Sequence, residues 1–117
     1  MARDQPLPAD AANPLEAERI QANMVQISGE VAVREPLRYS PGGVPILALE
    51  LTHRSRQSEG AVPRQVELEM ELLAIGEVAM KLDAVRPGQR VTARGFLANR
   101  SRRSRRVVLH VNEFEID

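Results

Sequence analysis

Residues 65–75 read QVELEMELLAI, the most regular stretch of the chain. Hydrophobic and polar residues alternate over its first eight positions, which is typical of a β-strand with one face in a core and the other in solvent. The two faces would carry Val66, Leu68, Met70 and Leu72 on one side and Glu67, Glu69 and Glu71 on the other. Three carboxylates in a row also suit acid–base chemistry or metal ligation, but we favour a solvated strand face.

Four further segments carry strand-like patterns on either side of this stretch. Residues 25–33 alternate around an internal Ser28-Gly29, where the glycine predicts a bulge or a sharp bend. Strands are also expected at 46–56, 89–97 and 107–116, with a short helix at 76–82 that ends before Arg86-Pro87-Gly88. Residues 35–45 and 57–63 are rich in turn-forming residues and are expected to be loops.

The order of these elements favours one fold. Three strands, a short helix and a two-strand hairpin predict an all-β domain over residues 23–117. This order matches the OB-fold, a five-stranded Greek-key barrel, with the short helix between strands 3 and 4. A β-sandwich would need more strands, and a doubly wound α/β fold would need a helix after each strand.

The composition excludes several classes of protein. The 117 residues suit one domain, and the lack of Cys rules out disulfides, zinc ribbons, iron–sulfur centres and thiol catalysis. No stretch is apolar for long enough to cross a bilayer and no signal peptide is recognisable, so we expect no membrane association and a cytoplasmic location. The only histidines, His53 and His110, lack an obvious third ligand, and no nucleophile motif is present. We therefore expect no metal, no cofactor and no enzymatic activity.

Residues 1–22 are expected to form a flexible N-terminal tail. Pro6, Pro8 and Pro14 interrupt it, and its charged side chains sum to −2. A short helix at 15–22, capped by Asn13-Pro14, would be marginal in isolation because no second apolar face supports it.

The formal net charge of zero conceals a strong separation of charge along the chain. Sixteen basic residues balance sixteen acidic ones, and all of the basic residues except Lys81 are Arg. Residues 84–112 contain eight arginines and no acid, so this window carries +8 and the remainder −8. Such asymmetry is a sign of a surface that binds a polyanion.

The charge is densest at residues 99–106, which read NRSRRSRR and are expected to be a hairpin loop. One interpretation is a solvated hairpin tip. The other is a phosphate-binding loop, because the Arg guanidinium offers paired donors to phosphate oxygens. Mutual repulsion among five like charges favours an anionic partner. If all five contacted phosphates of a single strand, log K against log salt would slope by about −3.5.

Several short motifs, in order, resemble those of primosomal replication protein N, the PriB family, which is related to bacterial single-stranded DNA-binding protein. The resemblance covers residues 23–116. The motifs are Ser28-Gly29, Pro36-Leu37-Arg38, Ser40-Pro41 with Gly43, His53-Arg54-Ser55, Arg64-Gln65, Gly88 with Arg90-Val91-Thr92 and Gly95-Phe96, and Val108-Leu109-His110. Each motif is weak alone, and their joint order and spacing make the resemblance specific.

The resemblance implies a non-enzymatic OB-fold homodimer that takes part in replication restart. Members bind single-stranded DNA and the PriA helicase, and they help to recruit DnaT in the bacteria that have it. Basic residues of the strand faces and of two loops carry DNA binding in the family. The matching positions here are Arg34, Arg38, Arg54, Arg64, Arg100, Arg102, Arg103, Arg105 and Arg106.

Aromatic residues are scarce, and the expected stacking platform is absent. Where better-known members place a Trp on the third strand, this chain has Glu67. Stacking of one base on an aromatic ring is worth about 1–3 kcal/mol, and a carboxylate supplies none of it. Tyr39, in the first long loop, either stacks a base or packs on its own loop, whereas Phe96 and Phe114 are expected in the core.

Two functions remain open from the residues. The leading hypothesis is an accessory protein of replication restart that holds single-stranded DNA through arginines, with help from Tyr39. The alternative is a protein-interaction module with weak DNA affinity that mainly docks onto the helicase.

Overall fold

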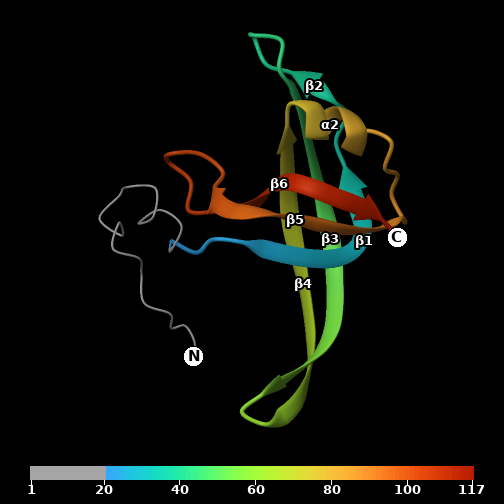
Figure 1. Cartoon of the computed structure of the whole chain (residues 1–117), viewed down its shortest axis with the longest axis vertical. Coiled ribbons are helices and arrows are strands. Elements are labelled where there is room, and N and C mark those ends of the chain that lie inside the picture. Colours follow the sequence, from blue (N-terminus) through green and yellow to red (C-terminus); the bar gives the residue numbers. More distant parts are fainter. Residues whose placement is uncertain (1–20) are drawn as a thin grey trace, which may run out of the picture.

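The computed structural model describes residues 21–117 (Figure 1). The predicted flexible tail, residues 1–22, and its short helix lie outside the described residues except for Gln21 and Ala22. The elements are β1 (Val25–Arg34), β2 (Arg38–Tyr39), β3 (Pro45–Glu59), β4 (Val62–Ile75), α2 (Glu77–Leu82), β5 (Arg90–Asn99) and β6 (Val107–Ile116).

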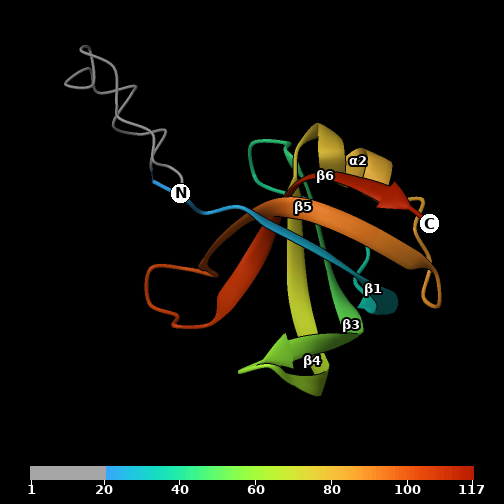
Figure 2. The same ribbon diagram turned by 60° about the horizontal axis from the view of Figure 1, so that its bottom comes forward.

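Five of the six strands close into a barrel. The strand order is β1-β5-β6-β4-β3-β2, and an additional antiparallel pairing of β1 with β3 closes the ring. All neighbours are antiparallel except β4 and β6, which run parallel. The short helix α2 follows the third barrel strand and lies over one end of the barrel (Figures 1 and 2). The prediction of a five-stranded OB barrel with this helix placement is confirmed.

Alternation along the strands divides the barrel into an apolar inside and a polar outside. Leu47, Leu49 and Leu51 of β3 are buried, and so are Leu72 and Ala74 of β4. From α2, Ala79 and Leu82 join the same core and close one end of the barrel. The faces of β4 are thus the two that period-two alternation predicts.

Gly29, where a bulge or a sharp bend was predicted, is not the bulge but a close approach of two backbones, next to the point where β1 changes its partner from β5 to β3. It pairs in register with Val91, and the irregularity of β1 lies further on, between Val31 and Val33. A Cβ at Gly29 would lie 2.6 Å from the carbonyl oxygen of Thr52 in the neighbouring β3. A glycine is required where a second main chain comes this near.

The β3–β4 hairpin is much longer than expected and projects from the barrel as an arm (Figure 1). Residues 57–63, predicted to be a loop, continue the ladder down to the pair Glu59–Val62. Only Gly60 and Ala61 make the turn, and both have positive φ, of 59° and 67°, which suits a tight two-residue hairpin turn. The predicted loop at 35–45 likewise contains β2, which pairs with the start of β3.

One core prediction is wrong. Phe96 is 39% exposed, because β5 directs Val91, Ala93 and Gly95 inward and leaves Phe96 on the opposite face. Phe114, by contrast, is partly buried and packs against the core cluster.

Candidate nucleic-acid interface

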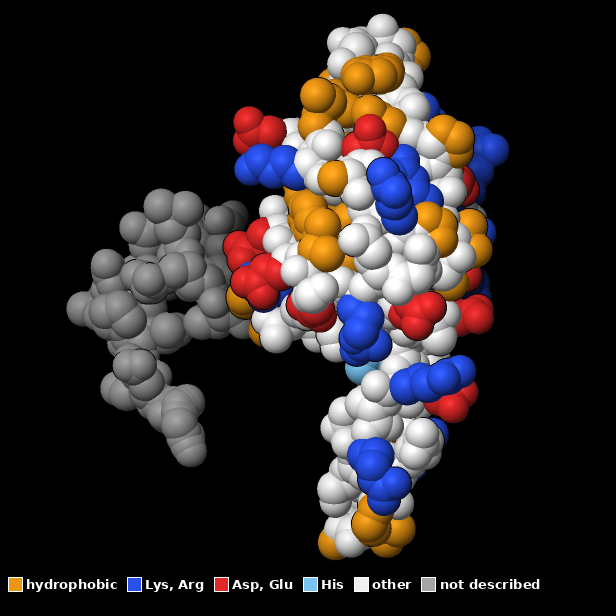
Figure 3. Space-filling view, turned by 90° about the vertical axis from the view of Figure 1, so that its right-hand side faces the viewer, with side chains coloured by type: hydrophobic (Ala, Val, Ile, Leu, Met, Phe, Trp, Pro, Cys, Tyr) orange, Lys and Arg blue, Asp and Glu red, His pale blue; other side chains and the backbone are white. Residues whose placement is uncertain are grey.

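The outer face of the β3–β4 ribbon carries both acidic and basic side chains. Ladder pairing sets Glu50 opposite Glu71, Thr52 opposite Glu69, and Arg54 opposite Glu67. Figure 3 shows one side of the molecule, where basic and acidic side chains intermingle and the arm ends in an apolar tip. This mixture means that the ribbon alone does not form a basic surface.

Arg54 and Glu67 form a loose pair on this face. Arg54 Nε lies 3.7 Å from Glu67 Oε2, and both side chains are well exposed. An exposed ion pair contributes little stability, at most about 1 kcal/mol, so Arg54 remains available to another anion. The Glu67 carboxylate is therefore a weak competitor for the Arg54 guanidinium.

The arginine-rich segment forms a structured hairpin loop, here called the Arg loop (residues 100–106). The Arg100 amide donates to the Arg106 carbonyl at 2.9 Å and closes the stem. Within the loop, Ser104 N–H bonds the Ser101 carbonyl and Arg106 N–H bonds Ser104 Oγ. Polar loop residues thus satisfy the backbone and leave the guanidinium groups outside.

Glu71 holds both ends of the Arg loop. Arg100 Nη1 hydrogen-bonds Glu71 Oε2, and Arg106 Nη2 lies 2.8 Å from Oε1 as an ion pair without hydrogen-bond alignment. The Glu71 side chain is only 16% exposed. The expectation that Glu71 shares a solvated face with Glu67 and Glu69 is therefore wrong, because the loop folds back over it.

The remaining three arginines of the loop are the tip arginines: Arg102, Arg103 and Arg105. All three are exposed. Within residues 21–117, none of them hydrogen-bonds or pairs with an acidic side chain. A compact loop thus presents three uncompensated cations, the pattern that suits phosphate oxygens.

Arg34 has a different environment from the other predicted site residues. Its Nη1 donates to the carbonyls of Asp83 and Val85 at 2.7 and 3.0 Å, and its Nη2 pairs with Asp83 Oδ1 at 2.6 Å. The Arg34 side chain is 18% exposed. It joins the end of β1 to the segment after α2, so its donors are used within the fold.

Replacing Arg34 with Gln is expected to lower the free energy of unfolding by about 1–2 kcal/mol, because hydrogen bonds to charged groups are strong but this site is partly hydrated. Urea denaturation followed by circular dichroism measures the loss. Affinity for an oligonucleotide should stay within twofold of the wild type. A large drop in affinity in a normally folded variant would show that Arg34 contacts DNA after all.

The other predicted residues lie at opposite ends of the molecule. Arg38 and Tyr39 form the exposed strand β2, with Tyr39 Oη 4.0 Å from Met80 Sδ of α2. Arg64 lies on the arm, where Nη1 pairs with Glu59 at 2.8 Å. Figure 1 shows β2 at the top and the arm at the bottom, so the predicted set does not gather into one patch.

Sequence reasoning missed an aromatic surface beside the Arg loop. Phe96 stacks on His110 with ring centroids 5.0 Å apart and planes within 5°. His110 pairs across the ladder with Leu73, two residues along β4 from Glu71. The outward position of Phe96 could have been found from alternation, since Leu97 is its inward-facing neighbour.

The two histidines do not share a site. His53 contacts the Ser28 carbonyl at 2.6 Å and Ser55 Oγ at 2.8 Å, and so ties β3 to β1. His110 instead faces Phe96 on β5. Among residues 21–117, no three His, Asp or Glu side chains are grouped so that they could hold a metal ion.

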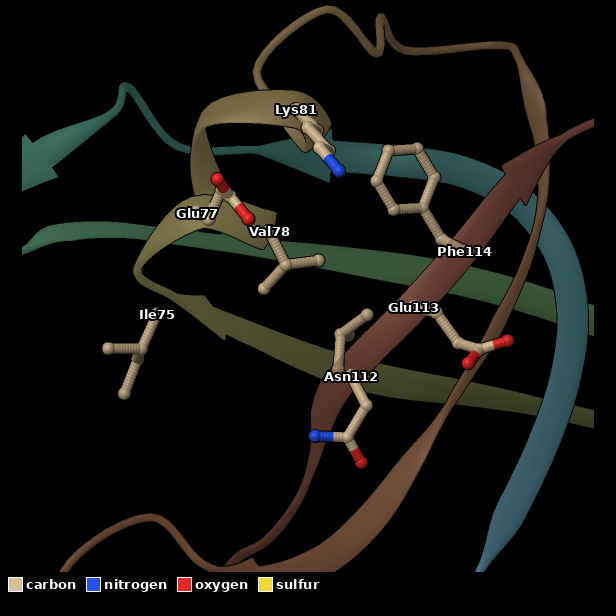
Figure 4. A pocket seen from close by; sticks show the side chains of 8 residues that line it. Ile75, Glu77, Val78, Lys81, Asn112, Glu113 and Phe114 are labelled. Carbon is tan, nitrogen blue, oxygen red and sulfur yellow. The ribbon is translucent and has the colours of Figure 1, made fainter.

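A cavity of about 420 Å³ lies between α2, the end of β4 and β6 (Figure 4). Lys81 from α2 and Phe114 from β6 are among its lining residues, and none of the predicted site residues lines it.

On β5, a side-chain hydrogen bond to Glu113 at 2.8 Å raises the pKa of Arg94 above its ordinary value. This guanidinium therefore stays charged and joins β5 to β6. No helix in the described part of the chain is long and apolar enough to span a bilayer.

A closed OB barrel with an arginine-rich loop between its last two strands defines a protein of the class of OB-fold single-strand-binding proteins. A model described as "Another single-strand binding protein family" matches residues 23–113. The replication restart protein PriB of Nitrosomonas europaea is 38% identical over 104 residues, which cover 89% of this chain and 96% of that protein. The PriB of Bordetella pertussis is 34% identical, over 78% of this chain and 85% of that protein. The chain belongs to the PriB family.

Solved structures agree with this assignment. The PriB structure from Ralstonia solanacearum superposes with a TM-score of 0.73 at 35% identity, covering 81% of this chain and 97% of that one. The single-stranded DNA-binding protein from Thermus aquaticus has a TM-score of 0.67 at 22% identity, covering 82% of this chain and 50% of that one. The second likeness shows a shared fold.

Proposed function

We propose that this protein binds single-stranded DNA through its Arg loop and the adjoining outer face of the barrel, as an accessory protein of replication restart. The names of its relatives, replication restart protein and single-strand-binding protein, support this role. Sequence preference should be slight, because phosphate contacts carry no base identity.

The observation that carries the proposal is the set of tip arginines. Among residues 21–117, the three guanidinium groups of the loop tip are exposed and pair with no acid, and like charges this close in the chain repel one another, which favours an anionic ligand. Phe96 lies in β5 three residues before Asn99, where the loop begins, and pairs across the ladder with His110 of β6, so a strand lying along the loop would pass an aromatic surface. Figure 2 shows the loop projecting from this end of β5 and β6. Phosphate contacts and base stacking are the two elements of general single-strand binding.

The direct test is fluorescence anisotropy of labelled oligo-dT at several salt concentrations. Binding should be measurable at low salt and should weaken steadily as salt rises, since each phosphate contact releases counterions. No binding at low salt, or an affinity that ignores salt, would contradict the proposal.

Phe96→Ala is expected to weaken oligo-dT binding about fivefold, which corresponds to about 1 kcal/mol, the low end for base stacking. The low end applies because His110 already covers one face of the ring. Phe96→Tyr, which keeps the ring, is the matched control and should bind as the wild type does. Equal affinities for the Ala and Tyr variants would argue against stacking at this position.

A second candidate function is docking onto the PriA helicase with little contribution from DNA. The exposed carboxylates Glu67 and Glu69 favour it, because they repel phosphate on the strand face where the family resemblance implies base stacking. Replacing the tip arginines Arg102, Arg103 and Arg105 with Ala separates the two functions. Loss of oligonucleotide binding with helicase binding intact supports the first, and the reverse result supports the second.

We also propose that the protein is a non-enzymatic, cytoplasmic homodimer, with DnaT as a further partner where that protein exists. The family resemblance supports these points. Sedimentation at two protein concentrations tests the dimer, and a monomer at both would reject it.

A further inference from the structure

We infer that Glu71 is the resident counter-ion of the Arg loop, which keeps Arg100 and Arg106 from phosphate and limits the loop to its tip arginines. The inference rests on the proposed function and deepens it. It names the residue that sets how many loop arginines reach the nucleic acid.

The first argument is the geometry of the pair. One carboxylate receives two guanidinium groups, Arg100 on Oε2 and Arg106 on Oε1. The carboxylate is 16% exposed, while Arg100 and Arg106 are 37% and 64% exposed. Because a largely desolvated carboxylate is costly when it is left alone, each arginine that moves to a phosphate removes part of the positive charge that stabilises Glu71, and both cannot leave together without that cost.

The second argument is the contrast with the other two acids of the same strand face. Glu67 is 60% exposed and lies 3.7 Å from its arginine, so phosphate can displace it. Glu69 is exposed and pairs with no arginine in the described part of the chain. Only Glu71 combines burial with two partners, and only Glu71 lies under the loop.

The third argument is the path of the backbone. The hydrogen bond from Arg100 N–H to the Arg106 carbonyl fixes the two stem residues side by side. Glu71 therefore meets both guanidinium groups from one position on β4. The tip arginines extend beyond this anchored stem, where solvent and ligands reach them.

Glu71→Gln tests the inference, since it removes the charge and keeps the size. Each phosphate contact on a single strand contributes about 0.7 to the slope of log K against log salt, so freeing two arginines should steepen the slope by about 1.4. At 0.1 M salt the same two contacts should tighten oligo-dT binding about 25-fold. Glu69→Gln is the matched control, because it removes the same charge from the same face but frees no arginine. Its slope should equal that of the wild type.

A slope for Glu71→Gln that is equal to or shallower than the wild-type slope overturns the inference, while salt-dependent wild-type binding would still support the proposed function. If Glu71→Gln does not fold, the single variant Arg106→Gln replaces it, because Arg100 still hydrogen-bonds the Glu71 carboxylate there. That variant should keep the wild-type slope, because Arg106 is already neutralised. A slope shallower by about 0.7 would show that Arg106 contacts phosphate.

A readout without DNA separates the inference from the proposed function. Phenylglyoxal, which modifies accessible and unpaired guanidinium groups, should label the tip arginines faster than Arg100 and Arg106 in the free wild-type protein. Peptide mass spectrometry measures the two rates, and Glu71→Gln should bring them together. Equal rates in the wild type would overturn the inference whether or not the protein binds DNA.

Discussion

Gly95→Ala is expected to lower the free energy of unfolding by about 3 kcal/mol or more, which is the upper range for inserting a group into a packed interior. The added Cβ would overlap the carbonyl oxygen of His110 and lie 3.1 Å from the Cα of Val111. Both are main-chain atoms of β6, which cannot rotate away as a side chain would. The β5–β6 ladder shifts register at this point, between Arg94 and Gly95. To make room for the added Cβ, the two strands would have to separate here.

Gly42→Ala is the matched control for this prediction. Gly42 lies in the loop before β3, and the nearest atom to a Cβ there is Ser40 Oγ at 3.9 Å. Its stability should therefore change little. Urea denaturation of both variants, followed by circular dichroism, measures the difference. Similar midpoints for Gly95→Ala and wild type would mean that β6 yields more easily than its packing indicates.

Period-two alternation predicted the barrel because it records which side of each strand faces the core. Residues 107–116 were expected as a strand and form β6 with the same bounds. The arm was missed for the same reason. Beyond the barrel there is no core to select alternating residues, so residues 57–63 lack the signal although their backbones continue the ladder.

The candidate site could be predicted only where its residues are neighbours in sequence. The Arg loop was evident as a run, but its counter-ion Glu71 lies 29 residues from Arg100, in another strand. Arg34 was assigned to DNA by family position, whereas its partner Asp83 is 49 residues away. Charge in a sequence shows where cations are, and only the fold shows which of them are already neutralised.

Replacing the tip arginines together, Arg102→Gln/Arg103→Gln/Arg105→Gln, is expected to weaken oligo-dT binding about 100-fold at 0.1 M salt, from three contacts of about 0.7 each. The slope of log K against log salt should also become shallower by about 2.1, because three phosphate contacts are lost. Fluorescence anisotropy across a salt series measures both quantities. The exposed loop position of these residues means that the fold should be unaffected.

Arg86→Gln provides the control for a general loss of positive charge. Arg86 is exposed in the turn before β5, whereas the Arg loop follows the far end of that strand. A uniform electrostatic field would make each lost arginine count equally wherever it lies, whereas local phosphate contacts make only loop arginines change the slope. If Arg86→Gln shifts the slope by as much as one tip arginine does, binding depends on overall charge. If only the tip variants shift it, DNA lies along the loop that Glu71 anchors.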